Sequence, residues 1–131
     1  MIRKLGIKFS VITLIVLNII ALSYHLIIIT ELIPYNNVWG GRLETREQMF
    51  QFETVSIVIN TFILLVVLVK GEYLKLQIPP KFMNILFWIF TILFAFNTLG
   101  NIFAESIWEV IIFTPLTLIS SILFWRLALD K

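Results

Sequence analysis

Residues 82–125 read FMNILFWIFTILFAFNTLGNIFAESIWEVIIFTPLTLISSILFW, two long apolar runs with a short polar break between them. Each run, 82–104 and 106–125, is close to the ~20 residues that a helix needs to cross a bilayer. Because only a few residues near Ala104–Ser106 separate the runs, the chain has to reverse sharply there. This stretch therefore predicts an antiparallel hairpin of two membrane-spanning helices.

Two further apolar runs, residues 9–33 and 50–69, have the same length and character. Hydrophobic residues make up 60% of the 131 residues, and charged residues make up 14%, below the ~25% usual in soluble domains. The sequence thus predicts an all-α membrane protein, an up-down-up-down bundle of four transmembrane helices. Since four spans leave no room for a soluble domain, residues 1–131 are expected to form one transmembrane domain.

Local signals mark the predicted ends of the spans. Pro34 is expected to close the first span, and Gly71 to end the second. Residues Thr45–Gln48 (TREQ) have the spacing of a capping box, so the second helix is expected to begin before the membrane surface. Pro79–Pro80 lead into the third span, since proline is tolerated in the first turn of a helix.

Basic residues are divided unevenly between the two sides of the predicted bundle. The connection between the first two spans holds two, Arg42 and Arg46, and the third connection holds none. Under the positive-inside rule, both termini and the loop around residues 70–81 are therefore predicted to be cytoplasmic. No basic patch extends beyond these flanks, so the pI of about 9.1 does not indicate a nucleic-acid partner. The eight basic residues on the predicted cytoplasmic side are Arg3, Lys4, Lys8, Lys70, Lys75, Lys81, Arg126 and Lys131.

The N-terminal span has an alternative interpretation as a cleaved secretory signal. It has a basic start, an apolar run and a small-x-small sequence at Ala21–Ser23. The apolar run continues to Ile33 without a break, however, and three more spans follow. The sequence therefore favours an uncleaved span.

Polar residues inside the spans are the candidates for function, because a charged group at mid-bilayer costs about 2.5–3.5 kcal/mol even on insertion scales. Glu53 and Asn60 share one face of the second helix, and Asn97 and Asn101 share a face of the third. His25 lies near the outer end of the first. If these faces converge, the bundle holds an outward-facing polar pocket. Its expected ligand-binding residues are His25, Glu53, Asn60, Asn97 and Asn101.

Most of these polar residues also have an ordinary structural interpretation. Asn, Ser and Thr in membrane helices usually form hydrogen bonds between helices. We expect this of Asn18, Asn60, Asn84 and the threonines and serines of the spans. Three glutamates lie close enough to the predicted outer surface to be solvated, namely Glu31, Glu105 and Glu109.

Glu53 and His25 have competing interpretations. Glu53 could form a structural ion pair with Arg42 or Arg46, or it could be functional, as intramembrane acids are by default. His25 is the only histidine, and it could act as a base oriented by Glu53. No serine nucleophile motif or phosphate-binding loop accompanies them, and cysteine is absent. We therefore find no catalytic motif and expect neither a cofactor nor a metal site.

The predicted outer loop is the least generic stretch outside the spans. Trp39 could anchor at the lipid headgroups, and Arg42 could hold an anion or Glu53, although an interfacial turn would also explain both. The segment P-Y-x-x-V-W-G-G-R-L at 34–43, followed by Phe52–Glu53, resembles a group of small four-span bacterial membrane proteins with no assigned activity. The resemblance implies a multi-pass protein of the bacterial inner membrane, and the positive-inside rule places both termini on its cytoplasmic side.

Three functions are compatible with these features. The leading one is a binding protein, whose pocket or outer loop engages a lipid, a small molecule, a second copy of the chain or another membrane subunit. The alternative is a small proton-coupled transporter that uses Glu53. This alternative is an analogy to small multidrug transporters, whose embedded glutamate lies at the centre of the first span, where this chain has no glutamate. The third is a membrane-embedded enzyme acting on a lipid-like substrate.

Overall fold

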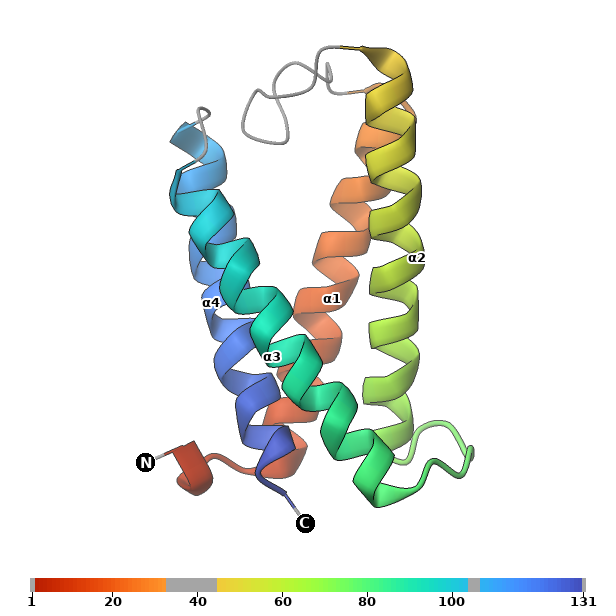
Figure 1. Cartoon of the computed structure of the whole chain (residues 1–131), viewed down its shortest axis with the longest axis vertical. Coiled ribbons are helices and arrows are strands. Elements are labelled where there is room, and N and C mark those ends of the chain that lie inside the picture. Colours follow the sequence, from red (N-terminus) through yellow and green to blue (C-terminus); the bar gives the residue numbers. More distant parts are fainter. Residues whose placement is uncertain (1, 33–44, 104–106, 131) are drawn as a thin grey trace.

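The computed structural model describes residues 2–32, 45–103 and 107–130. Within them lie four α-helices, α1 (Ile7–Ile29), α2 (Arg46–Lys70), α3 (Pro80–Ile102) and α4 (Ile107–Ala128), and a short 3-10 helix, η1 (Ile2–Lys4). All four α-helices are long and apolar enough to cross a membrane. The protein is an all-α four-helix bundle, as the sequence predicts (Figure 1).

The predicted helix boundaries are largely confirmed. The Thr45 hydroxyl accepts a hydrogen bond from the backbone N–H of Gln48 at 3.1 Å, so α2 begins with the expected cap. Gly71 is the C-cap of α2, and Pro80 lies in the first turn of α3.

The first helix ends earlier than its apolar run. α1 stops at Ile29 rather than near residue 33, because Thr30 caps the helix and donates its hydroxyl to the carbonyl of Ile27 at 2.8 Å. Glu31 then adopts a left-handed backbone conformation with φ of 65°, which cannot continue a right-handed helix. Pro34, which we expected to close α1, lies outside the described residues.

The helices form two hairpins that meet at one end and diverge toward the other (Figure 1). α1 packs along α2, α3 packs along α4, and contacts between α1 and α4 join the two hairpins. Both termini lie at the end where the hairpins meet, which we call the closed end (Figure 1). The opposite end, where α1 and α3 finish and α2 and α4 begin, is called the open end.

Aromatic packing joins α3 to α4 on the closed side of the molecule, within a buried core to which all four helices contribute. Phe87, Phe90 and Phe94 of α3 surround Phe124 of α4, with ring centroids 5.3 Å from Phe124 for both Phe90 and Phe94. All four rings are buried. Aromatic pairs at such distances stabilise a core beyond their buried area alone.

Two polar contacts tie the chain ends to this core. The Lys70 ammonium at the end of α2 lies 2.5 Å from the Asp130 carboxylate. The Arg126 guanidinium of α4 donates from Nε to the backbone carbonyl of Leu5 at 2.7 Å. Since these contacts connect α2, α4 and the N-terminal segment, they oppose separation of the hairpins at the closed end.

The expected hydrogen bonds between helices occur between α3 and α4. Thr98 donates to the hydroxyl of Thr117 at 3.0 Å, and Ser121 donates to the backbone carbonyl of Thr91 at 2.8 Å. Such bonds compensate for polar side chains that would otherwise face hydrocarbon.

Two asparagines do not follow this pattern. Asn60 donates to the carbonyl of Ser56 in its own helix at 2.7 Å. Asn18 is buried beside a small cavity of about 10 Å³, and its Oδ1 has no hydrogen-bond partner within the described residues. Within the described residues, Asn18 Oδ1 therefore does not form the expected bond between helices. The Asn60 amide instead bonds to a carbonyl of α2 itself.

Candidate functional site

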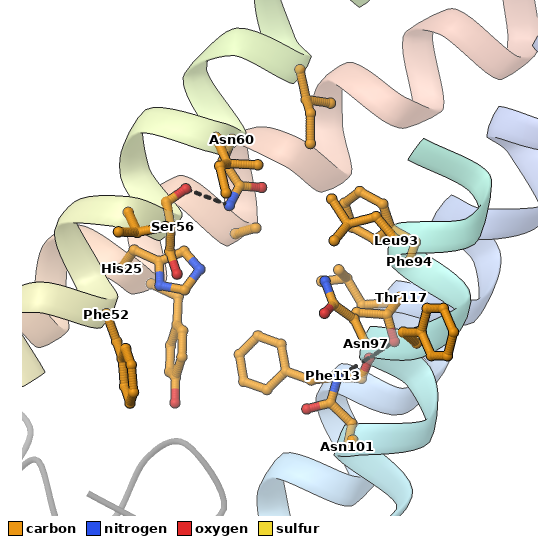
Figure 2. Close-up of a pocket in the computed structure, with 18 of the residues that line it drawn as sticks. His25, Phe52, Ser56, Asn60, Leu93, Phe94, Asn97, Asn101, Phe113 and Thr117 are labelled. Carbon is orange, nitrogen blue, oxygen red and sulfur yellow. Dashed lines mark hydrogen bonds between the residues drawn. The ribbon is translucent and has the colours of Figure 1, made fainter. Parts of the chain in front are cut away.

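A cavity of about 550 Å³ lies between the two hairpins, lined by residues of all four helices. Its volume falls in the range of about 300–1,000 Å³ typical of small-molecule sites. His25 and Ser56 lie on the wall formed by α1 and α2, and Asn97 and Asn101 lie on the facing wall, with open space between them (Figure 2). The divergence of the hairpins therefore creates a site that combines apolar and polar walls.

A buried acid supports the histidine on the first wall. His25 Nδ1 lies 2.6 Å from Oε2 of Glu53, which reaches across from α2. Glu53 is completely buried, whereas the side chain of His25 remains 17% exposed. Glu53 thus lies behind His25 rather than in the cavity lining, and it holds the imidazole in one orientation beside the cavity.

Of the alternatives considered for Glu53, an ion pair with Arg46 does not occur, because Arg46 pairs with Glu31. Arg46, at the start of α2, forms a bidentate ion pair with Glu31, which follows α1. Because Arg46 is exposed at the surface, it meets an exposed acid rather than the buried one. Arg42, the other predicted partner of Glu53, lies outside the described residues.

Tyr24 connects the two walls of the cavity. Its ring packs edge-on against His25, with centroids 5.9 Å apart, and lies 4.4 Å from the ring of Phe113 on α4. Tyr24 also lies within electrostatic range of both Glu53 and Glu109. The aromatic contact therefore joins the hairpins beside the polar groups of the site.

The facing wall is built from amides and a threonine. Asn101 Nδ2 lies 3.5 Å from the hydroxyl of Thr117, which also donates to the carbonyl of Phe113 in its own helix at 2.8 Å. Asn97, one turn before Asn101, also lines the cavity (Figure 2). Gly100 leaves space on this wall, because a Cβ added to it would meet no atom within 4 Å.

Glu109 lines the cavity, although the sequence predicted that it is solvated at the outer surface. We expected it to be solvated, but it is 5% exposed and lines the cavity. It lies in the first turn of α4, where a carboxylate is favoured by the helix N-terminus. Its sequence signal is the spacing of Glu109, Phe113 and Thr117, which step by four residues along one face of α4. All three line the cavity.

The structure gathers most of the predicted pocket residues in one place. His25, Asn60, Asn97 and Asn101 line the cavity, with Glu53 directly behind His25. Their role in binding a ligand stays a prediction. The remaining candidates, Trp39 and Arg42 of the predicted outer loop, lie outside the described residues, as does Glu105.

The described part of the chain contains no group of three His, Asp or Glu side chains placed to hold a metal ion. Comparisons of the chain with protein-family models, curated proteins and solved structures find no match. The resemblance to small four-span bacterial proteins therefore stays a prediction.

Proposed function

We propose that this protein lies in the bacterial inner membrane with both termini in the cytoplasm, and that its cavity binds a lipid or another small amphipathic molecule. The observation that carries the proposal is the cavity of about 550 Å³, which gathers polar side chains from four otherwise apolar helices. Polar and ionisable groups inside a membrane protein are costly, and they usually mark a site or a pathway. An amphipathic molecule would match both the apolar and the polar parts of the lining.

The composition of the walls supports this choice of ligand. Aromatic and aliphatic side chains such as Phe94 and Ile63 form much of the lining, and the hydrogen-bonding groups are few and clustered. Binding sites for small molecules usually combine a mainly apolar surface with a few polar groups that fix orientation. Under the proposed topology, the His25 end of the cavity lies toward the outer surface.

The proposed topology can be tested with single cysteines, because the chain has none. Lys75→Cys lies on the proposed cytoplasmic side, and Glu47→Cys lies on the proposed outer side. In intact cells, a membrane-impermeant maleimide is expected to label Glu47→Cys only, and both variants should react after permeabilisation. Labelling of Lys75→Cys alone in intact cells would invert the proposed orientation.

Cavity filling tests the proposed binding directly. Gly100→Trp would place an indole in the cavity, where an added Cβ has open space. Its matched control is Leu99→Trp, which adds an indole at the neighbouring residue, whose side chain is 52% exposed. Native mass spectrometry of the full-length proteins from mild detergent should show a bound lipid or small molecule in the wild type and in Leu99→Trp. Gly100→Trp should lose it.

Two outcomes would contradict the proposal. The first is a wild-type protein that carries no bound molecule and acquires none from an added lipid extract. The second is equal retention by Gly100→Trp and Leu99→Trp, which would place the bound molecule elsewhere on the bundle.

A small proton-coupled transporter is the second candidate function, favoured by the buried Glu53 next to His25. Embedded acids and histidines form proton relays in many membrane transporters. In proteoliposomes, an imposed ethidium gradient is expected to drive proton movement, and Glu53→Gln is expected to abolish it. If the wild-type protein moves no protons under this gradient, the transport proposal for cationic dyes fails.

A further inference from the structure

We infer that the cavity selects an amphiphile with a cationic head group, which enters from the bilayer between α2 and α3. This inference rests on the proposed binding function. It specifies the charge of the ligand and the path by which the ligand enters the cavity. Three features of the described residues carry it: the charges of the lining, the placement of the aromatic rings, and the packing of α2 and α3.

The charged groups at the cavity favour a cation. Glu109 lines the cavity, and no lysine or arginine of the described residues does. The basic side chain of the described lining is His25, whose Nδ1 lies 2.6 Å from the Glu53 carboxyl oxygen. An imidazolium next to a carboxylate, or an imidazole next to a carboxylic acid, has no net positive charge. Glu109 therefore adds a negative charge whenever it is ionised, and an anionic head group finds no lysine or arginine among the described residues of the lining.

The rings of the cavity suit an ammonium group. The rings of Tyr24 and Phe113 lie with their centroids 4.4 Å apart in a tilted arrangement, and Glu109, Phe52 and Phe94 also line the walls. Aromatic faces attract ammonium groups more strongly when water is excluded, and quaternary ammonium ligands are commonly held in this way. A head group at this level would also have the amide oxygen of Asn97 within the same lining.

The bundle is least closed between α2 and α3. Their main packing partners are α1 and α4 respectively, although α2 and α3 follow each other in sequence. Figure 1 shows the two helices diverging toward the open end. Three cavity-lining side chains of this region are substantially exposed at the apolar surface, namely Phe52 (45%), Val55 (56%) and Phe96 (66%). A ligand with an alkyl chain could therefore place its head group inside while the chain stays among the lipids.

The first test compares two probes of equal chain length, dodecyltrimethylammonium and dodecyl sulfonate, on the full-length protein in nanodiscs of neutral lipid. We expect the ammonium probe to bind at least about tenfold more tightly, which corresponds to about 1.4 kcal/mol. Glu109→Gln should reduce this preference about tenfold or more, because hydrogen bonds and contacts to a charged group are the strong ones. Glu31→Gln, which removes an exposed acid outside the cavity, should leave it unchanged.

The outcomes separate this inference from the proposed function. Equal binding of both probes by the wild type, abolished by Gly100→Trp, would overturn the charge selection and leave the binding function standing. Failure of both probes and of added lipid to bind would contradict the binding function itself. The comparison of probes on the wild type remains decisive even if Glu109→Gln does not fold.

The route between α2 and α3 is tested by rates. Val55→Trp would obstruct the cavity side of α2, whereas Val58→Trp adds the same bulk at a residue that is 62% exposed and does not line the cavity. We expect Val55→Trp to slow association of dodecyltrimethylammonium several-fold in stopped-flow measurements, and Val58→Trp to leave the rate unchanged. Equal association rates for both variants and the wild type would exclude entry along this side.

Discussion

At the scale of single residues, the contact between Glu53 and His25 joins α1 to α2 inside an apolar bundle. Removing one member of a buried ion pair typically costs about 3–5 kcal/mol, whereas replacing both by apolar side chains is often nearly neutral. We expect Glu53→Leu to fall at the lower end of this range, because His25 keeps some exposure and can be solvated. The double variant Glu53→Leu/His25→Leu should be more stable than Glu53→Leu alone.

Denaturant unfolding of the wild type, Glu53→Leu, His25→Leu and the double variant in one detergent measures this coupling. A coupling free energy of at least about 1 kcal/mol is expected, since contacting residues in one network deviate from additivity by about 0.5–3 kcal/mol. Strictly additive effects of the two substitutions would show that the 2.6 Å contact contributes little to stability.

A second pair lies at the end of α1, where Arg46 donates to both carboxylate oxygens of Glu31. These hydrogen bonds hold the pKa of Glu31 below its ordinary value of 4.5. Because the pKa is lower in the folded state, the contribution to stability is present above about pH 4.5 and is lost as the pH falls through the folded pKa. Both side chains are exposed, so salt should weaken the effect.

The pKa of Glu31 can be measured by following its carboxyl carbon in an NMR titration of the isotopically labelled protein. The midpoint should lie below 4.5 in the wild type and rise toward that value in Arg46→Gln. An identical midpoint in both proteins would exclude Arg46 as the cause of the shift.

At the scale of the helices, two glycines have opposite surroundings. A Cβ on Gly71, at the end of α2, would come within 2.7 Å of Val11 on α1, so Gly71 allows α1 and α2 to approach closely. Gly71→Ala is therefore expected to destabilise the protein by about 1–3 kcal/mol, as overpacking usually does. Gly100→Ala, inside α3 with open space around the new methyl group, is expected to be neutral or to stabilise by up to about 1 kcal/mol.

Thermal unfolding of the two variants in the same detergent provides the comparison, and each serves as the control for the other. If Gly71→Ala and Gly100→Ala shift the unfolding temperature equally, then helix propensity, rather than the contact with Val11, determines the role of Gly71.

The helices could be predicted from sequence because four apolar runs of bilayer length have few alternative structures. Their ends were predicted where a local signal exists, as at Thr45 and Gly71. α1 was predicted too long, because the left-handed backbone of Glu31 has no glycine to mark it. Periodicity also placed Asn60 and Asn97 on candidate faces, and both line the cavity. It also aligns Glu109 with Thr117 on one face of α4, but whether that face meets the cavity depends on the angle between the hairpins.

At the scale of the whole molecule, the bundle is held unevenly. A buried apolar core of residues from all four helices, the Lys70–Asp130 pair and the contact between Arg126 and Leu5 secure the closed side. Beside the cavity, the ring of Tyr24 contacts that of Phe113 across the two hairpins. Packed interiors resist deformation, whereas regions with few buried contacts open more readily. The two hairpins should therefore move relative to each other mainly at the open end.

Pairs of spin labels can compare the two ends, because the chain has no cysteine to remove. Labels at Gln51 and Ile102 report on the open end, and labels at Leu65 and Ile85 report on the closed end; all four residues are exposed. Pulsed electron paramagnetic resonance in nanodiscs is expected to give a broader distance distribution for the open-end pair. Adding Gly100→Trp should narrow that distribution, since the indole would fill space between the hairpins, and leave the closed-end pair unchanged. Distance distributions of equal width at both ends would mean that the contacts at the open end hold the hairpins as firmly as the buried core at the closed end does.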